Sequence, residues 1–319
     1  MRLGRTPILV IAAGGVLGTL GFGGLLFSIT GHSTQTTVSD GGGHAVIPGL
    51  AHDGVAPQPT STPPATATPA PTATPTAVAG PPSVKGLRVW AGGDSVGAFV
   101  AQNFAQDLVA AGATPQCSTT AETSGEVDNT CYFWKISTGL ARLDYFDWLG
   151  KLQQIANDDH PAITLFMAGG NDAQTLIAAD GSPTGLAPFS DAWNAAYAQR
   201  VSQAMDILTS NGSYAIWVGM PIMLDANEYP GFNANMQKLD AIFAAQAAAH
   251  PRVAYVDAYS LMSDPQGSFA QSLPDIHGVT QQMRASDGVH LTEQGGEFLA
   301  QHAIQALFTL MQQQPAATP

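Results

Sequence analysis

Residues 162–172 read AITLFMAGGND, and this stretch decides the fold that the sequence predicts. Its first seven residues form a continuous apolar run of strand length, which is typical of a strand covered by helices on both faces. Two further apolar strands are predicted at residues 214–219 (YAIWVG) and 253–257 (VAYVD), and a shorter one at residues 86–92 (GLRVWAG). Two glycines and then the polar residues Asn171 and Asp172 follow AITLFMA, so the same stretch also indicates a site.

Segments with helical patterns alternate with these strands. We predict helices over residues 96–111, 145–155, 191–210, 233–250 and 292–312. A repeated strand–helix order predicts parallel strands joined by right-handed crossovers. We therefore expect one α/β domain over residues 84–313, with a mainly parallel central sheet and its site at the carboxyl ends of the strands.

Three polar segments lie at the predicted strand ends or just before the last helix. Ser95 follows the first strand, Asn171 follows AITLFMA, and Asp287 and His290 belong to the segment DGVH. A serine hydroxyl needs a base within hydrogen-bonding reach, which His290 supplies, and Asp287 can orient the imidazole. The Asn171 amide and the N–H groups where Ser95 opens a helix favour an oxyanion. Taken singly, each segment is also explained as a helix cap or a turn.

These segments resemble the motif blocks of the SGNH hydrolase superfamily, the GDSL-type esterases. Ser95 in GGDS is similar to the first block, Asn171 in GGND to the G-x-N-D block, and Asp287 and His290 in DGVH to the D-x-x-H block. Gly139 in STGL is the best match to the glycine block. The chain further resembles a bacterial subgroup of largely undefined function whose members often carry an N-terminal membrane segment.

The resemblance implies a three-layer α/β/α sandwich of flavodoxin-like type that acts on ester bonds. Ser95 would be the nucleophile, His290 the base and Asp287 the partner that orients it. The backbone N–H groups of Ser95 and Gly139 and the side chain of Asn171 would bind the oxyanion. Neither a metal nor an organic cofactor is implied.

Two ends of the chain differ in composition from this domain. Arg2 and Arg5 precede an uncharged run over residues 7–31, which is long enough to cross a membrane and predicts a single-pass anchor, with a cleaved signal peptide as the alternative. The positive-inside rule then places the rest of the chain outside the cytoplasm. Residues 32–83, first Gly- and Ser-bearing and then rich in Pro, Thr and Ala, predict a disordered linker, and residues 314–319 a short tail.

The charge of the chain argues against one class of partner, and its two cysteines predict a disulfide. The formal net charge is −13 with only 11 Lys and Arg residues, which argues against nucleic acid. Outside the cytoplasm, Cys117 and Cys131 are expected to form a disulfide, although two unrelated buried thiols are the alternative.

The spacing of the histidines does not match that of a metal-binding site, because none lies at ligand spacing from a second His or Cys. Arg284 either binds an anionic or carbonyl group or forms a surface salt bridge.

The leading hypothesis is an extracytoplasmic serine esterase that removes acyl groups, with acetyl favoured, from a cell-envelope carbohydrate. The first alternative is an O-acetyltransferase with the same acyl-enzyme, which would need a membrane partner as acyl donor. The second alternative is a binding or scaffold module that keeps the fold without catalysis. An intact nucleophile, base and amide donor argue against that module.

Overall fold

The computed structural model of the chain describes residues 82–114, 120–123, 126–129, 132–225 and 231–314. The predicted membrane anchor, nearly all of the predicted linker and tail, and both cysteines of the predicted disulfide lie outside these ranges. Among the described residues, no helix has the combination of length and apolar character that a membrane span needs.

The central sheet consists of seven strands, which are β1 (Val89–Gly93), β2 (Thr120–Thr123), β3 (Glu126–Asn129), β4 (Tyr132–Lys135), β5 (Ile163–Met167), β6 (Tyr214–Val218) and β7 (Val253–Val256). Their order across the sheet is β2-β3-β4-β1-β5-β6-β7. The five strands from β4 to β7 in this order are parallel, whereas β2 and β3 form an antiparallel hairpin beside β4. Four of the five parallel strands, β1, β5, β6 and β7, match predicted strands, whereas the sequence analysis did not predict β4.

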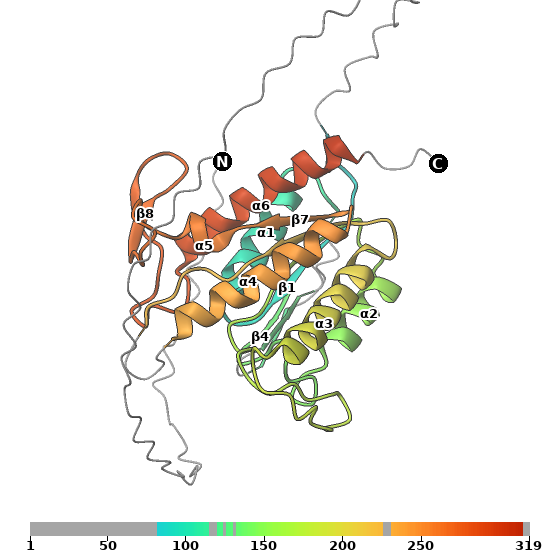
Figure 1. Cartoon of the computed structure of the whole chain (residues 1–319). Helices are drawn as coiled ribbons and strands as arrows, with labels where there is room; N and C mark the ends of the chain where they lie inside the picture. The colour runs from blue at the N-terminus through green and yellow to red at the C-terminus, as the bar shows by residue number, and fades with distance from the viewer. Residues whose placement is uncertain (1–81, 115–119, 124–125, 130–131, 226–230, 315–319) are drawn as a thin grey trace, which may run out of the picture. The chain divides into compact units, whose positions relative to one another are not determined.

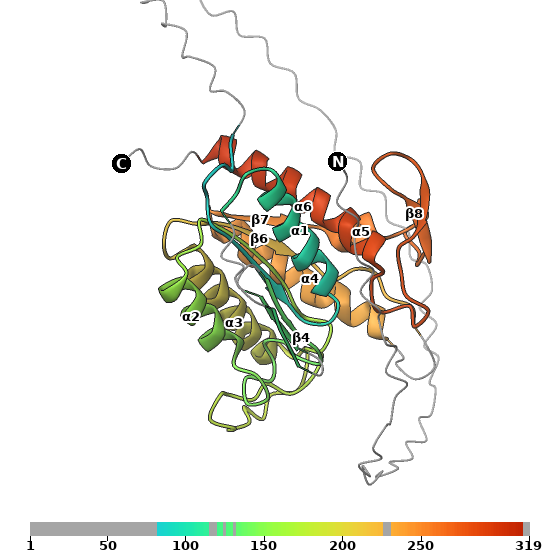
Figure 2. The same cartoon turned by 180° about the vertical axis from the view of Figure 1, so that it is seen from behind.

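Helices cover both faces of the sheet and give three layers (Figure 1, Figure 2). The long helices are α1 (Ala98–Ala110), α2 (Trp148–Asp158), α3 (Asp191–Thr209), α4 (Phe232–Ala249) and α6 (Glu293–Gln313). Helix α1 packs against α6, whereas α3 packs against both α2 and α4. The predicted α/β fold with a mainly parallel sheet is therefore confirmed.

The central strands are apolar because helices leave neither face to water. Every residue of β1, β5 and β6 is buried. In this core, the ring of Phe166 packs against Trp148 of α2 and Trp217 of β6, with ring centroids 5.0 and 5.1 Å away. Burial of such large rings supplies much of the hydrophobic stabilisation of a domain of this size.

Side-chain caps fix where the helices begin. The predicted helix from residue 145 begins instead at Trp148, because Asp147 Oδ1 accepts the N–H of Gly150 at 3.0 Å and ends the preceding loop. Thr292 caps α6 in the same way by accepting the N–H of Gly295 at 3.1 Å. This second cap places the start of α6, at Glu293, within one turn of the predicted base His290.

Residues 257–285, between the last predicted strand and the last predicted helix, contain regular structure. They hold the short helix α5 (Ala258–Leu261) and a hairpin of β8 (Ser272–Pro274) and β9 (Thr280–Gln282). Strands this short leave no periodic pattern to read in a sequence. The turn between them is stabilised by Asp275, whose Oδ1 accepts the N–H groups of His277 and Val279, both at 2.9 Å.

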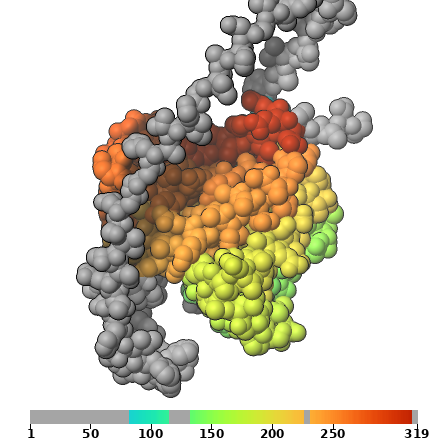
Figure 3. All heavy atoms as spheres, viewed as in Figure 1, coloured from blue at the N-terminus to red at the C-terminus, as the bar shows by residue number. Residues whose placement is uncertain are grey.

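The segment between β5 and α3 projects from the body of the molecule. In the space-filling view it forms a lobe at the end from which α3 starts (Figure 3). This segment begins at the carboxyl end of β5 and carries Asn171 near its start. The lobe therefore stands at the end of the sheet where the sequence predicts the site.

Candidate active site

Ser95 lies in the tight turn between β1 and α1. The helix begins at Ala98, so Ser95 precedes the helix instead of opening it. The turn is held by the buried carboxylate of Asp94, whose Oδ1 accepts the N–H groups of Val96 at 2.8 Å and Gly97 at 3.3 Å. Within the described ranges, the N–H of Ser95 has no hydrogen-bond acceptor. That N–H is therefore available to an oxyanion.

The same Asp94 side chain joins the serine turn to the segment that carries Asn171. Its Oδ2 accepts the N–H groups of Gly169 at 3.0 Å and Gly170 at 3.1 Å. Complete burial raises the pKa of Asp94 to about 6, although these backbone donors act in the opposite direction. The sequence predicts no role for Asp94, although its position between two glycines and Ser95 at the end of a strand could have indicated one.

His290 and Asp287 meet Ser95 in the order that nucleophilic catalysis requires. Nε2 of His290 lies 3.0 Å from Oγ of Ser95, and its Nδ1 lies 2.6 Å from Oδ2 of Asp287. The other carboxylate oxygen of Asp287 accepts the N–H groups of Val289 at 2.8 Å and His290 at 2.9 Å. These bonds fix the carboxylate in its loop and leave one oxygen free for the imidazole.

The hydrogen bonds also set the charge of Asp287. Partial burial acts to raise its pKa, but the bonds from the His290 side chain and from the two backbone N–H groups outweigh it, and the pKa falls below 3.8. Asp287 is thus ionised at neutral pH. An ionised carboxylate beside Nδ1 keeps a proton on that nitrogen and leaves Nε2 as the acceptor that faces Ser95.

Gly139 and Asn171 lie together at the carboxyl ends of β4 and β5. The Asn171 side chain donates from Nδ2 to the carbonyl of Thr138 at 2.9 Å, so the amide is tied to the residue that precedes Gly139. One amide hydrogen remains for another acceptor. The Gly139 N–H has no acceptor among the described residues. Donors from two separate loops are therefore available on this side of the site.

A buried network fixes the loop after Gly139. The carboxylate of Asp172 accepts the N–H groups of Leu140 at 2.9 Å and Ala141 at 2.8 Å and the hydroxyl of Tyr197 at 2.6 Å. Arg200 donates to the carbonyl of Leu140 at 2.7 Å. Burial raises the pKa of Asp172 against the effect of these donors. None of these residues could be assigned a role from the sequence, although Asp172 ends the G-x-N-D block.

Glycine at position 139 is required by the close approach of Asp172. A Cβ at this position would lie 2.1 Å from Oδ1 of Asp172, far inside van der Waals contact. We expect Gly139→Ala to push the loop away from the carboxylate and to destabilise the fold by about 1–3 kcal/mol. A displacement of about 1 Å would lower ester turnover by roughly 10²-fold. Kinetics and thermal unfolding check this, and full activity would show that the loop carries no donor.

The segment after β6 contacts the loop that contains His290. The N–H of Leu224 donates to the carbonyl of Gly288 at 3.1 Å, and Gly288 has a positive φ of 69°. A side chain at Gly288 would also collide with Leu224, since an added Cβ would lie 2.5 Å from its Cβ. Glycine is therefore needed in DGVH for both conformation and space.

Asp240 of α4 fixes the beginning of the segment that follows β6. Its buried Oδ1 accepts the N–H of Met220 at 2.7 Å. Burial, with the nearby charge of Asp257, raises the pKa of Asp240 to about 7. Since folding favours the protonated form, the contribution of Asp240 to stability is complete below the unfolded pKa of about 3.8 and is lost as the pH rises through about 7.

Asp240→Asn should remove this pH dependence, because asparagine still offers a carbonyl oxygen to Met220 but cannot ionise. Relative to the wild type, we expect the unfolding free energy of the variant to improve by on the order of 2–4 kcal/mol between about pH 4 and pH 8. Urea unfolding at the two pH values measures this difference. If the unfolding free energies of the variant and the wild type differed by the same amount at both pH values, the Asp240 carboxyl would act only through its hydrogen bond.

A family model described as "Protein of unknown function (DUF459)" matches residues 88–306. The chain belongs to the DUF459 family. No curated protein matches it.

Solved structures similar to this DUF459 chain carry enzyme descriptions. One is a GDSL-like lipase from Bacteroides thetaiotaomicron, with 14% identity, 72% of this chain and 93% of that chain covered, and a TM-score of 0.44. A second is a carbohydrate esterase family 3 protein from Talaromyces cellulolyticus, with 13% identity, coverage of 71% and 99%, and a TM-score of 0.44. A third is a catalytic mutant of an acetylxylan esterase from Geobacillus stearothermophilus, with 12% identity, coverage of 70% and 94%, and a TM-score of 0.43.

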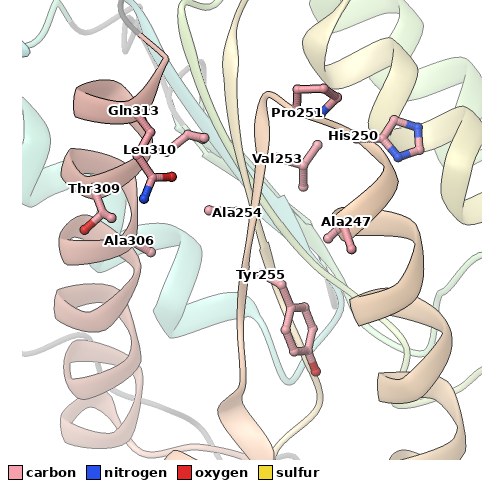
Figure 4. Close-up of a pocket in the computed structure, with 11 residues that line it drawn as sticks. Ala247, His250, Pro251, Val253, Ala254, Tyr255, Ala306, Thr309, Leu310 and Gln313 are labelled. Atoms are coloured by element: carbon pink, nitrogen blue, oxygen red, sulfur yellow. The ribbon is translucent and has the colours of Figure 1, made fainter. Parts of the chain in front are cut away.

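A pocket of about 410 Å³ in the DUF459 chain lies away from Ser95. It is lined by residues from α4, β7 and α6, among them Ala247, Val253, Tyr255 and Leu310 (Figure 4). The pocket stands beside β7 and the last turns of α4 and α6, whereas Ser95 follows the carboxyl end of β1. Within the described ranges, no group of three or more His, Cys, Asp or Glu residues could hold a metal ion.

Arg284 does not form the surface salt bridge that was one of the two alternatives from the sequence. Its side chain is fully buried and donates to the backbone carbonyls of Ile222, Gly288 and Val289 at 2.7, 3.1 and 2.6 Å. The surface alternative is therefore wrong. The carbonyl groups that Arg284 binds belong to its own chain.

Proposed function

We propose that this DUF459 protein is a serine hydrolase of the SGNH type that cleaves acyl esters through an acyl-enzyme at Ser95. The observation that carries the proposal is the order of contacts from Ser95 Oγ to His290 Nε2, at 3.0 Å, and from His290 Nδ1 to Asp287 Oδ2, at 2.6 Å. This order is what activation of a serine requires. Residues far apart in the sequence come together to make it.

Attack begins when Ser95 Oγ bonds to the carbonyl carbon of the ester and its proton passes to Nε2 of His290. The carbonyl π electrons move to the oxygen, which becomes the oxyanion. The N–H groups of Ser95 and Gly139 and the amide of Asn171 are the donors available to it. A side-chain donor of this kind contributes about 10²–10³-fold to the rate.

The reaction then proceeds in two halves. The imidazolium returns its proton to the leaving alcohol oxygen as the bond from carbon to that oxygen breaks, which leaves an ester on Ser95. His290 next takes a proton from water, whose oxygen attacks the acyl carbon. Collapse of the second intermediate returns the proton to Ser95 Oγ and releases a carboxylic acid. The ionised Asp287 stabilises the imidazolium in both halves.

We propose a cell-envelope carbohydrate as the alcohol part and a short acyl group, with acetyl favoured, as the acid part. The side chains of His290 and Asp287 are 43% and 48% exposed, so the site opens directly to solvent. An open site suits an ester that projects from a large polymer. The expected N-terminal anchor and linker support action outside the membrane at the end of a tether, or after secretion if the N-terminal segment is cleaved.

The full-length chain in detergent, treated with a fluorophosphonate probe, provides the test. We expect covalent labelling at Ser95 and turnover of p-nitrophenyl acetate. A correctly folded chain that neither labels nor turns over would favour the binding module instead. Supplying a glycan acceptor separates the two enzymatic possibilities, because acyl transfer faster than hydrolysis would assign the protein as an acetyltransferase.

A further inference from the structure

Arg284 is a buried cation held by carbonyl groups. Its side chain has 0% exposure, and among the described residues no carboxylate forms a salt bridge with it. Burial lowers its pKa to about 10, so the guanidinium keeps its charge at neutral pH. A buried charge is costly unless its hydrogen bonds are satisfied. The hydrogen bonds that Arg284 donates from its buried position therefore indicate its role.

Those bonds reach two separate loops. The NH1 nitrogen donates to the carbonyl of Ile222 in the segment after β6, at 2.7 Å. The NH2 nitrogen donates to the carbonyls of Gly288 and Val289, at 3.1 and 2.6 Å. Gly288 and Val289 are the two residues between Asp287 and His290. One guanidinium thus ties the loop that carries the base to a second loop of the site.

Arg284 is itself fixed in place by the β8–β9 hairpin. Its carbonyl accepts the side-chain amides of Gln271 at 2.7 Å and Gln282 at 3.0 Å, and its N–H donates to the carbonyl of Gln271 at 3.2 Å. The ring of Phe269 lies 5.6 Å from the guanidinium carbon. The hairpin also contacts α6 through β9. Arg284 is therefore anchored to the hairpin and, through the hairpin, to α6.

We propose that Arg284 is a positioning residue, which holds the backbone between Asp287 and His290 so that the imidazole stays within hydrogen-bonding distance of Ser95. It acts through backbone carbonyl groups, and among the described residues no hydrogen bond or ion pair joins it to the side chains of Ser95, Asp287 or His290. The inference rests on the proposed function for its kinetic readout. Lysine cannot replace it, because a single nitrogen cannot reach carbonyls of two loops at the positions that NH1 and NH2 occupy.

The test compares Arg284→Lys and Arg284→Met with the wild type in the full-length chain. We expect kcat for p-nitrophenyl acetate to fall by roughly 10²-fold in both variants, because the base is displaced from Ser95. KM should stay within about threefold, since no substrate contact is removed. Fluorophosphonate labelling of Ser95 should slow in parallel. Guanidinium ion added to Arg284→Met should restore part of kcat.

The matched control is Arg252→Met. Arg252 stacks on Tyr214, with 4.7 Å from the guanidinium carbon to the ring centroid, and precedes the amino end of β7. This variant also loses a packed arginine, and we expect a lower melting temperature with kcat unchanged. Wild-type kcat in folded Arg284→Lys would overturn the proposal. So would a kcat in Arg284→Met that falls no further than in Arg252→Met.

Hydrogen exchange gives a readout that does not depend on hydrolysis. The N–H groups of Val289 and His290 are bonded to Asp287, so loosening of this loop should speed their exchange in Arg284→Lys. If the wild type neither labels nor turns over, the proposed function fails while exchange still decides the inference. Unchanged exchange at both amides would overturn the positioning role in either case.

Discussion

Ser95→Ala is expected to abolish fluorophosphonate labelling and to lower the turnover of p-nitrophenyl acetate by about 10³-fold or more. The variant removes the oxygen that forms the acyl-enzyme in the proposed reaction, while the turn around it is held by backbone N–H groups bonded to Asp94, which do not involve the hydroxyl. Its melting temperature should therefore stay close to that of the wild type. Initial rates and mass spectrometry of the labelled chain provide the measurements.

A second serine–histidine contact offers the matched control. Ser202 Oγ lies 3.3 Å from Nε2 of His250, and Oδ1 of Asp206 lies 3.3 Å from the same nitrogen. Because the serine and the carboxylate share one ring nitrogen, this group cannot pass a proton in the order that activates a serine. Ser202→Ala should keep full labelling and turnover. Residual activity near the wild-type level in Ser95→Ala would remove the nucleophile from the proposal.

The parts of the fold that could be predicted are those with a strong local pattern. AITLFMA contains β5, because a short apolar run of that length is typical of a buried strand. The central strands β1, β5 and β6 are buried over their whole length. The helix predicted over residues 191–210 is α3, within one residue at its end. The β2–β3 and β8–β9 hairpins could not be predicted, since their short strands (TAET, EVDN, SLP and TQQ) lack the apolar run that marks a strand of similar length such as β7 (VAYV).

Some residues of the candidate site could also be predicted from the sequence, whereas others could not. Ser95, His290 and Asp287 stand in short motifs whose chemistry is readable, and the structure brings them together. Asp94 and Arg284 could not be assigned, because a charged residue in a loop normally reads as solvent-exposed. Both are fully buried here, and their partners are backbone groups of segments distant in sequence. Backbone partners leave no trace in side-chain patterns.

Asp287→Asn tests the carboxylate with a nearly isosteric amide. The amide oxygen can still accept the N–H groups of Val289 and His290, so the loop should keep its shape. The NH₂ group then faces Nδ1 of His290 and donates to it. This favours the tautomer with its proton on Nε2, which can no longer accept a proton from Ser95. We expect turnover to fall by about 10³- to 10⁴-fold, the loss that the wrong tautomer causes in such triads.

The charge of Asp287 decides how this result depends on pH. Its pKa lies below 3.8, so the wild-type carboxylate is ionised at every pH above about 5 and the loss in Asp287→Asn should persist across that range. Asp275→Asn is the control, because the Oδ1 of Asp275 also accepts two backbone N–H groups, both at 2.9 Å, in a turn that carries His277. It should leave turnover unchanged. A loss in Asp287→Asn no larger than that in Asp275→Asn would mean that Asp287 only shapes its loop, and the imidazole would then have to activate Ser95 without a carboxylate partner.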